Sequence, residues 1–168
     1  MSRKSASIGG RRRAARIAAV QALYQMALSG GAPDEVIAEF VAYRLRGDEA
    51  RTARQPEADV ELFADIVRGA TAGRASADAV IGEALDKDRK FVRLEILMQS
   101  ILRAGTYELQ ARDDIDAALT ISEYVAVADA FFNEREPALV NAVLDRVART
   151  LADRRPPADS AHDIAQDR

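Results

Sequence analysis

The chain has 168 residues, of which 48% are hydrophobic and 30% are charged, a balance typical of a globular protein with one sizeable core. It contains no cysteine, which excludes disulfides, thiolate metal sites and cysteine nucleophiles. No apolar run approaches the roughly 20 residues that span a bilayer, and glycines and arginines interrupt the place where a signal peptide has its apolar core. We therefore expect a soluble, cytoplasmic protein with no membrane segment.

Apolar residues recur at helical spacing from near the start of the chain. The spacing predicts a first helix over residues 11–29, ended by a glycine pair, after a flexible basic arm over residues 1–10. Pro33 suits the first turn of a second, shorter helix. The polar residues 46–58, which contain glycine and proline, are then expected to form a surface loop.

Two further helices are expected before the middle of the chain. The third has apolar residues at helical spacing from Val60 and ends near Gly73. Ser76 or Asp78 is expected to cap the fourth, because both side chains can accept hydrogen bonds from the first N–H groups of a helix. The charged residues 86–90 follow as a connector.

The second half of the chain predicts three more helices. Residues 92–111 are apolar on more than one face, which indicates the central helix of the fold. A sixth helix begins after Asp114 and ends around residues 131–133, and Pro137 suits the first turn of the seventh. The polar residues 154–168 predict a disordered tail. No segment alternates with period two, so we predict an all-α protein with about seven helices and no sheet.

The residue combinations of common enzyme and metal sites are missing. The sequence has no phosphate-binding loop and no GxGxxG motif. Its single histidine, His162, lies in the polar tail, which argues against a histidine base or a zinc site. Adjacent carboxylates such as Asp113 and Asp114 lie in connectors, where capping and solvation account for them. We expect a protein that is not an enzyme and that needs no cofactor or metal.

Charge is divided unevenly along the chain. The first 33 residues carry six basic side chains and no acid, whereas the remaining 135 carry 18 basic and 27 acidic ones, a net charge of −9. Arginine stays charged when partly desolvated and pairs bidentately with phosphate, so the cluster predicts contact with a polyanion. A nucleic acid is favoured, and an acidic partner protein stays open as the alternative. The candidate residues are Arg11, Arg12, Arg13 and Arg16.

Four segments, taken together and in order, resemble the NusB family. Each is an amphipathic helix with little specificity of its own, but their order and spacing match the family over about residues 11–150. The segments are ARIAAVQALYQ (15–25), ILRAGTYEL (101–109), ISEYVAVADAF (121–131) and LVNAVLDRV (139–147).

The resemblance implies a fold and a function. The fold would be a NusB-like pair of packed helical subdomains, here about residues 11–90 and 91–153. The function would be non-enzymatic: members bind the single-stranded boxA element of ribosomal RNA leader transcripts together with NusE, a ribosomal protein. They act in the RNA polymerase antitermination complex, which suppresses termination and promotes ribosomal RNA transcription.

The resemblance also implies which residues contact RNA. Arginines that meet RNA phosphates in the family match Arg12 and Arg13, with Arg11 and Arg16 close by. The family often has a phenylalanine at the position of Leu139, which can pack against a base but has no π face for stacking.

The implied NusE surface draws on the first helix. It matches Tyr24 and Leu28, and Met98 takes a position where an acidic residue often faces NusE. The same apolar surface could serve a homodimer, so both assemblies stay open.

Two rival interpretations remain. The first is a protein-interaction module of the same fold with weakened RNA binding, which the leucine at position 139 and the acidic body of the chain motivate. The second is the RNA-binding appendage of an RNA methyltransferase. It ranks last, because the chain contains no glycine-rich cofactor-binding segment.

Overall fold

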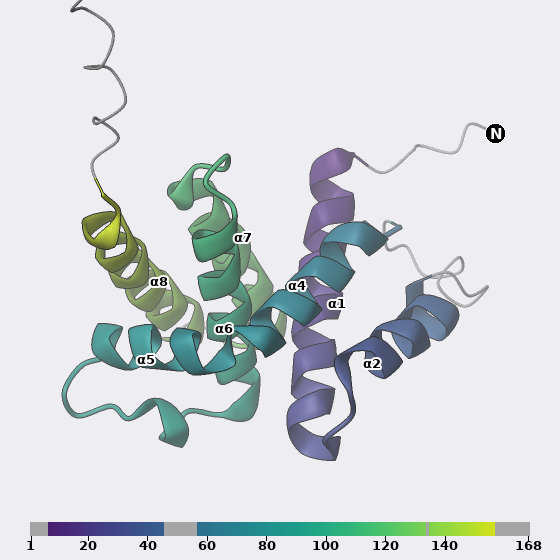
Figure 1. Cartoon of the computed structure of the whole chain (residues 1–168), viewed down its shortest axis with the longest axis horizontal. Helices are drawn as coiled ribbons and strands as arrows, with labels where there is room; N and C mark the ends of the chain where they lie inside the picture. Colours follow the sequence, from purple (N-terminus) through teal and green to yellow (C-terminus); the bar gives the residue numbers. More distant parts are fainter. Residues whose placement is uncertain (1–6, 46–56, 134, 157–168) are drawn as a thin grey trace, which may run out of the picture.

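The computed structural model describes residues 7–45, 57–133 and 135–156. These residues form seven α-helices and no strand, as predicted, and none of these helices is long and apolar enough to cross a membrane (Figure 1). A π-helical turn, Val41–Leu45, extends the second helix, and a short 3-10 turn, Phe91–Arg93, precedes the fifth. The helices are α1 (Ile8–Ser29), α2 (Pro33–Phe40), α4 (Val60–Ala72), α5 (Arg74–Ala84), α6 (Ile96–Ala111), α7 (Ala117–Phe131) and α8 (Arg135–Arg154).

The first helix begins earlier than its apolar pattern predicts. The Ser7 hydroxyl accepts a hydrogen bond from the Gly10 N–H at 3.1 Å, and this N-cap starts α1 at Ile8. The last residues of the predicted arm are therefore helical. At the other end Gly30 adopts the left-handed conformation with φ 75°, and its N–H bonds to the Met26 carbonyl at 2.8 Å. The glycine stop is confirmed.

The starts of α5 and α6 also differ from the prediction. No side chain caps α5, which follows α4 after one residue, so neither Ser76 nor Asp78 serves as the expected cap. Asp78 instead accepts hydrogen bonds from Arg103 at 2.7 and 2.9 Å. The fifth predicted helix begins at Ile96 rather than near residue 92, because the 3-10 turn takes up the preceding residues.

The helix α6 lies at the centre of the fold, as its apolar faces predict. It packs on α1 and α4 on one side and on α5, α7 and α8 on the other (Figure 1). The helices α1, α2 and α4 pack on one another, and α5 packs on α6 and α8. The group formed by α1, α2 and α4 therefore ends at Gly73, between α4 and α5. The subdomain boundary near residue 90 stays a prediction.

Two glycines let neighbouring helices approach α6 closely. A Cβ atom on Gly105 would lie 2.8 Å from a methyl group of Leu144 on α8, and one on Gly69 of α4 would lie 2.0 Å from the Tyr107 ring. A larger side chain at either position would push two helices apart. This close packing holds α4 and α8 against the central helix, and a Cβ atom on Gly105 would also lie 3.3 Å from the Tyr124 ring of α7.

Candidate nucleic-acid interface

Three consecutive arginines stand near the start of α1. Arg11 and Arg13 are exposed and Arg12 is half-buried. Successive side chains of an α-helix point about 100° apart, so the three guanidinium groups fan around the helix and do not form one stripe. Such a fan can contact several phosphates of a strand that crosses the helix end.

The fourth candidate, Arg16, is not part of this surface. Its side chain is 5% exposed, and its Nε and Nη2 atoms donate to the two Glu108 carboxylate oxygens at 2.8 and 3.0 Å. Burial lowers the pKa of Arg16, but the hydrogen bonds and charge of Glu108 outweigh it and leave the pKa raised. This geometry does not support the predicted contact between Arg16 and RNA, because the guanidinium is buried and already paired with a carboxylate.

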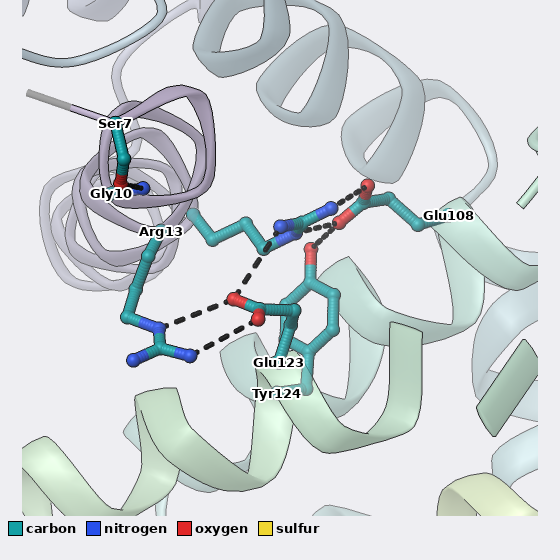
Figure 2. Close-up of polar contacts among 7 residues, drawn as sticks. Ser7, Gly10, Arg13, Glu108, Glu123 and Tyr124 are labelled. Atoms are coloured by element: carbon teal, nitrogen blue, oxygen red, sulfur yellow. Dashed lines mark hydrogen bonds and ion pairs between the residues drawn. The ribbon is translucent and has the colours of Figure 1, made fainter. Parts of the chain in front are cut away.

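The carboxylate of Glu108 has a third donor from α7. The Tyr124 hydroxyl donates to Glu108 Oε2 at 2.6 Å, and both side chains are fully buried (Figure 2). Burial and the adjacent Glu108 charge raise the pKa of Tyr124 well above its ordinary value. The three groups thus satisfy one another inside the core, at the point where α1, α6 and α7 meet.

A second carboxylate connects this buried group to the surface. Glu123 of α7 lies 3.6 Å from Arg16 Nη1, and it accepts hydrogen bonds from Arg13 Nε at 3.2 Å and Arg13 Nη2 at 3.0 Å (Figure 2). The hydrogen bond and charge of Glu123 raise the pKa of Arg13. One arginine of the fan is therefore held in place by α7.

Sequence reasoning missed Glu108, Glu123 and Tyr124, although one signal pointed to them. Arg16 shares a helical face with Val20 and Leu23, at spacings of four and seven residues, and that face is buried. An arginine on an apolar face needs a buried acceptor, because an unpaired buried charge is strongly destabilising.

The turn between α6 and α7 lies near the arginine fan. A hydrogen bond from Arg112 lowers the pKa of Asp114, and the positive charge of Arg12 lowers it further. The Asp114 carboxylate in this turn is thus balanced by Arg112, and the positive charge of the candidate interface lies along α1.

Leu139, the other predicted RNA contact, lies on a different helix. It is half-buried on α8 and packs against the core, and the main neighbours of α8 are α5, α6 and α7. In the described part of the chain, α1, which carries the arginine fan, is not among these main neighbours.

Of the three residues predicted to contact NusE, two are exposed and one is buried. Tyr24 is 37% exposed and Leu28 is 59% exposed, and both lie on one face of the C-terminal half of α1. Met98 is only 3% exposed and belongs to the core, so its side chain is not part of this exposed face. The methionine side chain packs into the core from the first turn of α6.

Comparison with known proteins gives one consistent family. Residues 13–149 match the model of the NusB family. The transcription antitermination protein NusB of Mesorhizobium japonicum is 49% identical over 141 residues, covering 84% of this chain and 90% of the relative. The protein of the same description from Sinorhizobium fredii is 47% identical over 140 residues, covering 83% of this chain and 87% of its own length.

Solved structures of NusB proteins have a similar fold. T. maritima NusB superposes with a TM-score of 0.67 at 27% identity, covering 82% of this chain and 90% of that one. A crystal structure of the antitermination factors NusB and NusE in complex with dsRNA contains a chain with a TM-score of 0.68 at 23% identity, and the match covers 86% of this chain and 99% of that one. The second similarity is one of fold.

Proposed function

The chain belongs to the NusB family, and from this premise we propose that it is an RNA-binding transcription antitermination factor. It binds boxA-like single-stranded RNA together with the ribosomal protein NusE, within the RNA polymerase antitermination complex, and so promotes ribosomal RNA transcription. It is a cytoplasmic adaptor that performs no catalysis. The observation that carries the RNA site is the fan of Arg11, Arg12 and Arg13 at the start of α1.

The arginine fan supports affinity more than sequence specificity. Each neutralised phosphate contributes about 0.7 to the slope of log affinity against log salt for a single strand, so three contacts give a slope of about −2. Raising the salt from about 50 to 200 mM would then weaken binding roughly 20-fold. Phosphate contacts do not distinguish bases, so the sequence preference has to come from other contacts in the complex.

The exposed apolar pair on α1 supports a separate partner surface. Tyr24 and Leu28 lie on the opposite half of the helix from the arginines. Leu28 lies 15 positions after Arg13. At about 1.5 Å per residue this is about 22 Å of helix, so RNA and a protein can occupy α1 together without competing for the same residues.

A titration of boxA-like RNA tests the proposal. It should be performed with the chain alone and with NusE, at two salt concentrations, and repeated with the variant carrying both Arg12→Ala and Arg13→Ala. We expect the double variant to bind more weakly, with a shallower salt dependence and unchanged helix content. Equal RNA affinity in the double variant would contradict the site assignment.

A second candidate is a NusB-like protein-interaction module with weakened RNA binding. The half-buried Leu139 favours it, because this residue offers no aromatic ring at the position where the family often has phenylalanine. Formation of a complex with NusE that does not bind boxA-like RNA would support this candidate. Light scattering of the pure chain and of its mixture with NusE would distinguish a homodimer from a heterocomplex.

A further inference from the structure

Charged side chains of alternating sign form a ladder from the core to the surface. It begins at the buried Tyr124 hydroxyl and continues through Glu108, Arg16 and Glu123 to Arg13. Side-chain exposure rises along the four charged members, from 0% at Glu108 to 5%, 17% and 50% at the last. Arg13 is therefore connected to the core by a continuous series of ion pairs and hydrogen bonds.

The ladder fixes the plane of one guanidinium group. Glu123 binds Arg13 through two atoms, Nε and Nη2, which is the geometry that restricts both the position and the rotation of an arginine head. An arginine has five N–H donors, so this contact uses two of them. The remaining donors belong to a half-exposed side chain and can meet an incoming acceptor.

We propose that Glu123 is a positioning residue for RNA binding: it holds the Arg13 guanidinium so that the unused donors face a phosphate. This inference rests on the proposed function. Arg16 fixes Glu123 from behind, since its Nη1 atom lies 3.6 Å from Glu123 Oε2 while Glu108 holds its other edge. Arg16 thus positions the Glu123 carboxylate, and Glu123 in turn positions the exposed Arg13.

A competing effect has the opposite sign. The negative charge of Glu123 repels a phosphate bound on the far side of Arg13, at about 8 Å, which in water and physiological salt weakens binding by less than about twofold. Ordering a free arginine side chain on binding weakens affinity by about two- to tenfold, and a side chain that is already ordered avoids that loss. Positioning is therefore the larger effect.

The test is Glu123→Gln, which removes the charge and one of the two strong acceptors while keeping the shape. We expect the affinity for boxA-like RNA, measured with NusE present, to fall about two- to tenfold. The fall occurs although the variant carries one negative charge fewer. The matched control is Asp129→Asn, which makes the same charge change on an exposed residue of the same helix. We expect the control to bind as well as the wild type or slightly more tightly.

A double-mutant cycle separates positioning from a structural role. In a chain that already carries Arg13→Ala, Glu123→Gln should leave the affinity unchanged or raise it by less than about twofold, because the residue it positions is gone and only the weak repulsion is removed. An equal loss in both backgrounds, or a Glu123→Gln variant that binds as tightly as the wild type or more tightly, would overturn the proposal. Thermal unfolding of each variant checks the fold.

A second substitution, Glu123→Asp, keeps the proposal testable if the Glu123→Gln variant does not fold. Glu123→Asp keeps the charge but withdraws the carboxylate by one methylene. If Glu123 positions Arg13, this variant should bind RNA more weakly. If Glu123 acts only through its charge, the RNA affinity should not change. Wild-type affinity in this variant would overturn the proposal. A wild-type chain that binds no RNA, with or without NusE, would overturn the proposed function itself, and the inference about Glu123 with it.

Discussion

Replacing Arg16 by methionine should strongly destabilise the fold. Methionine fills much of the same unbranched space, but the fully buried Glu108 carboxylate then loses its cation. Removing one partner of a buried ion pair costs about 3–5 kcal/mol, because the remaining charge stays desolvated. A typical free energy of unfolding is about 5–15 kcal/mol, so this loss is a large share of the total.

The measurement is urea unfolding followed by circular dichroism. We expect a lower midpoint with an unchanged slope, because the substitution alters stability and not the surface exposed on unfolding. For a chain of this size each kcal/mol shifts Tm by about 2–4 °C, so 3–5 kcal/mol corresponds to a fall of about 6–20 °C. Arg149→Met is the matched control, because this arginine is exposed and its ion pair with Asp145 lies on the surface of α8.

A compensating substitution tests the cause. Adding Glu108→Gln to Arg16→Met removes the unpaired charge. It keeps a side-chain carbonyl that can accept the hydrogen bond from the Tyr124 hydroxyl. The double variant should recover at least half of the lost stability, since buried ion pairs can be replaced by neutral groups at little cost. An Arg16→Met variant within about 1 kcal/mol of the wild type, or a double variant no more stable than the single one, would refute this account of the pair.

Three further predictions concern surface and core. The variant with Arg12→Ala and Arg13→Ala should lower the salt slope of RNA binding by about 1.4, measured by titration at several salt concentrations. Leu28→Gln should weaken binding of the NusE partner about 10- to 100-fold, measured by calorimetry, and leave RNA binding by the chain alone unchanged. Burial raises the pKa of Tyr124 in the folded state, so the unfolded chain loses this proton first as the pH rises above about 10, and stability falls there by at most about 1.4 kcal/mol per pH unit. Tyr124→Phe should remove that part of the slope, and an identical slope in both proteins would contradict it.

Helix positions could be predicted from the sequence because they depend on local patterns. The apolar spacing of residues 92–111 identified the central helix, and the glycine after residue 29 identified the end of the first. Helix starts were predicted less well, because capping depends on single hydrogen bonds. Ser7 caps α1 inside the segment read as a flexible arm, and Asp78 binds Arg103 instead of capping α5.

The interior of the site could not be predicted from charge clustering. Arg16 was grouped with the neighbouring arginines because they are adjacent in sequence, yet its partner Glu108 is 92 residues away. A carboxylate at that distance becomes a neighbour only through the packing of α1 on α6. Met98 shows the same limit, since its place on the sequence does not reveal that the packing of α6 buries it.

The arrangement of α1 explains how weak and unspecific phosphate contacts could serve a specific complex. Arg13 and Leu28 lie on one continuous helix, and the ion-pair ladder ties the N-terminal half of that helix to α6 and α7. The helix fixes the distance along its axis between Arg13 and Leu28 at about 22 Å. An RNA held by both proteins then binds the second one as an intramolecular step, at an effective concentration set by that fixed geometry. On the proposed function, a few arginine contacts that read no bases can thus contribute to a complex tighter than they would form alone. The same geometry requires that RNA affinity rise sharply when NusE is present, and that most of this rise be lost in the Leu28→Gln variant.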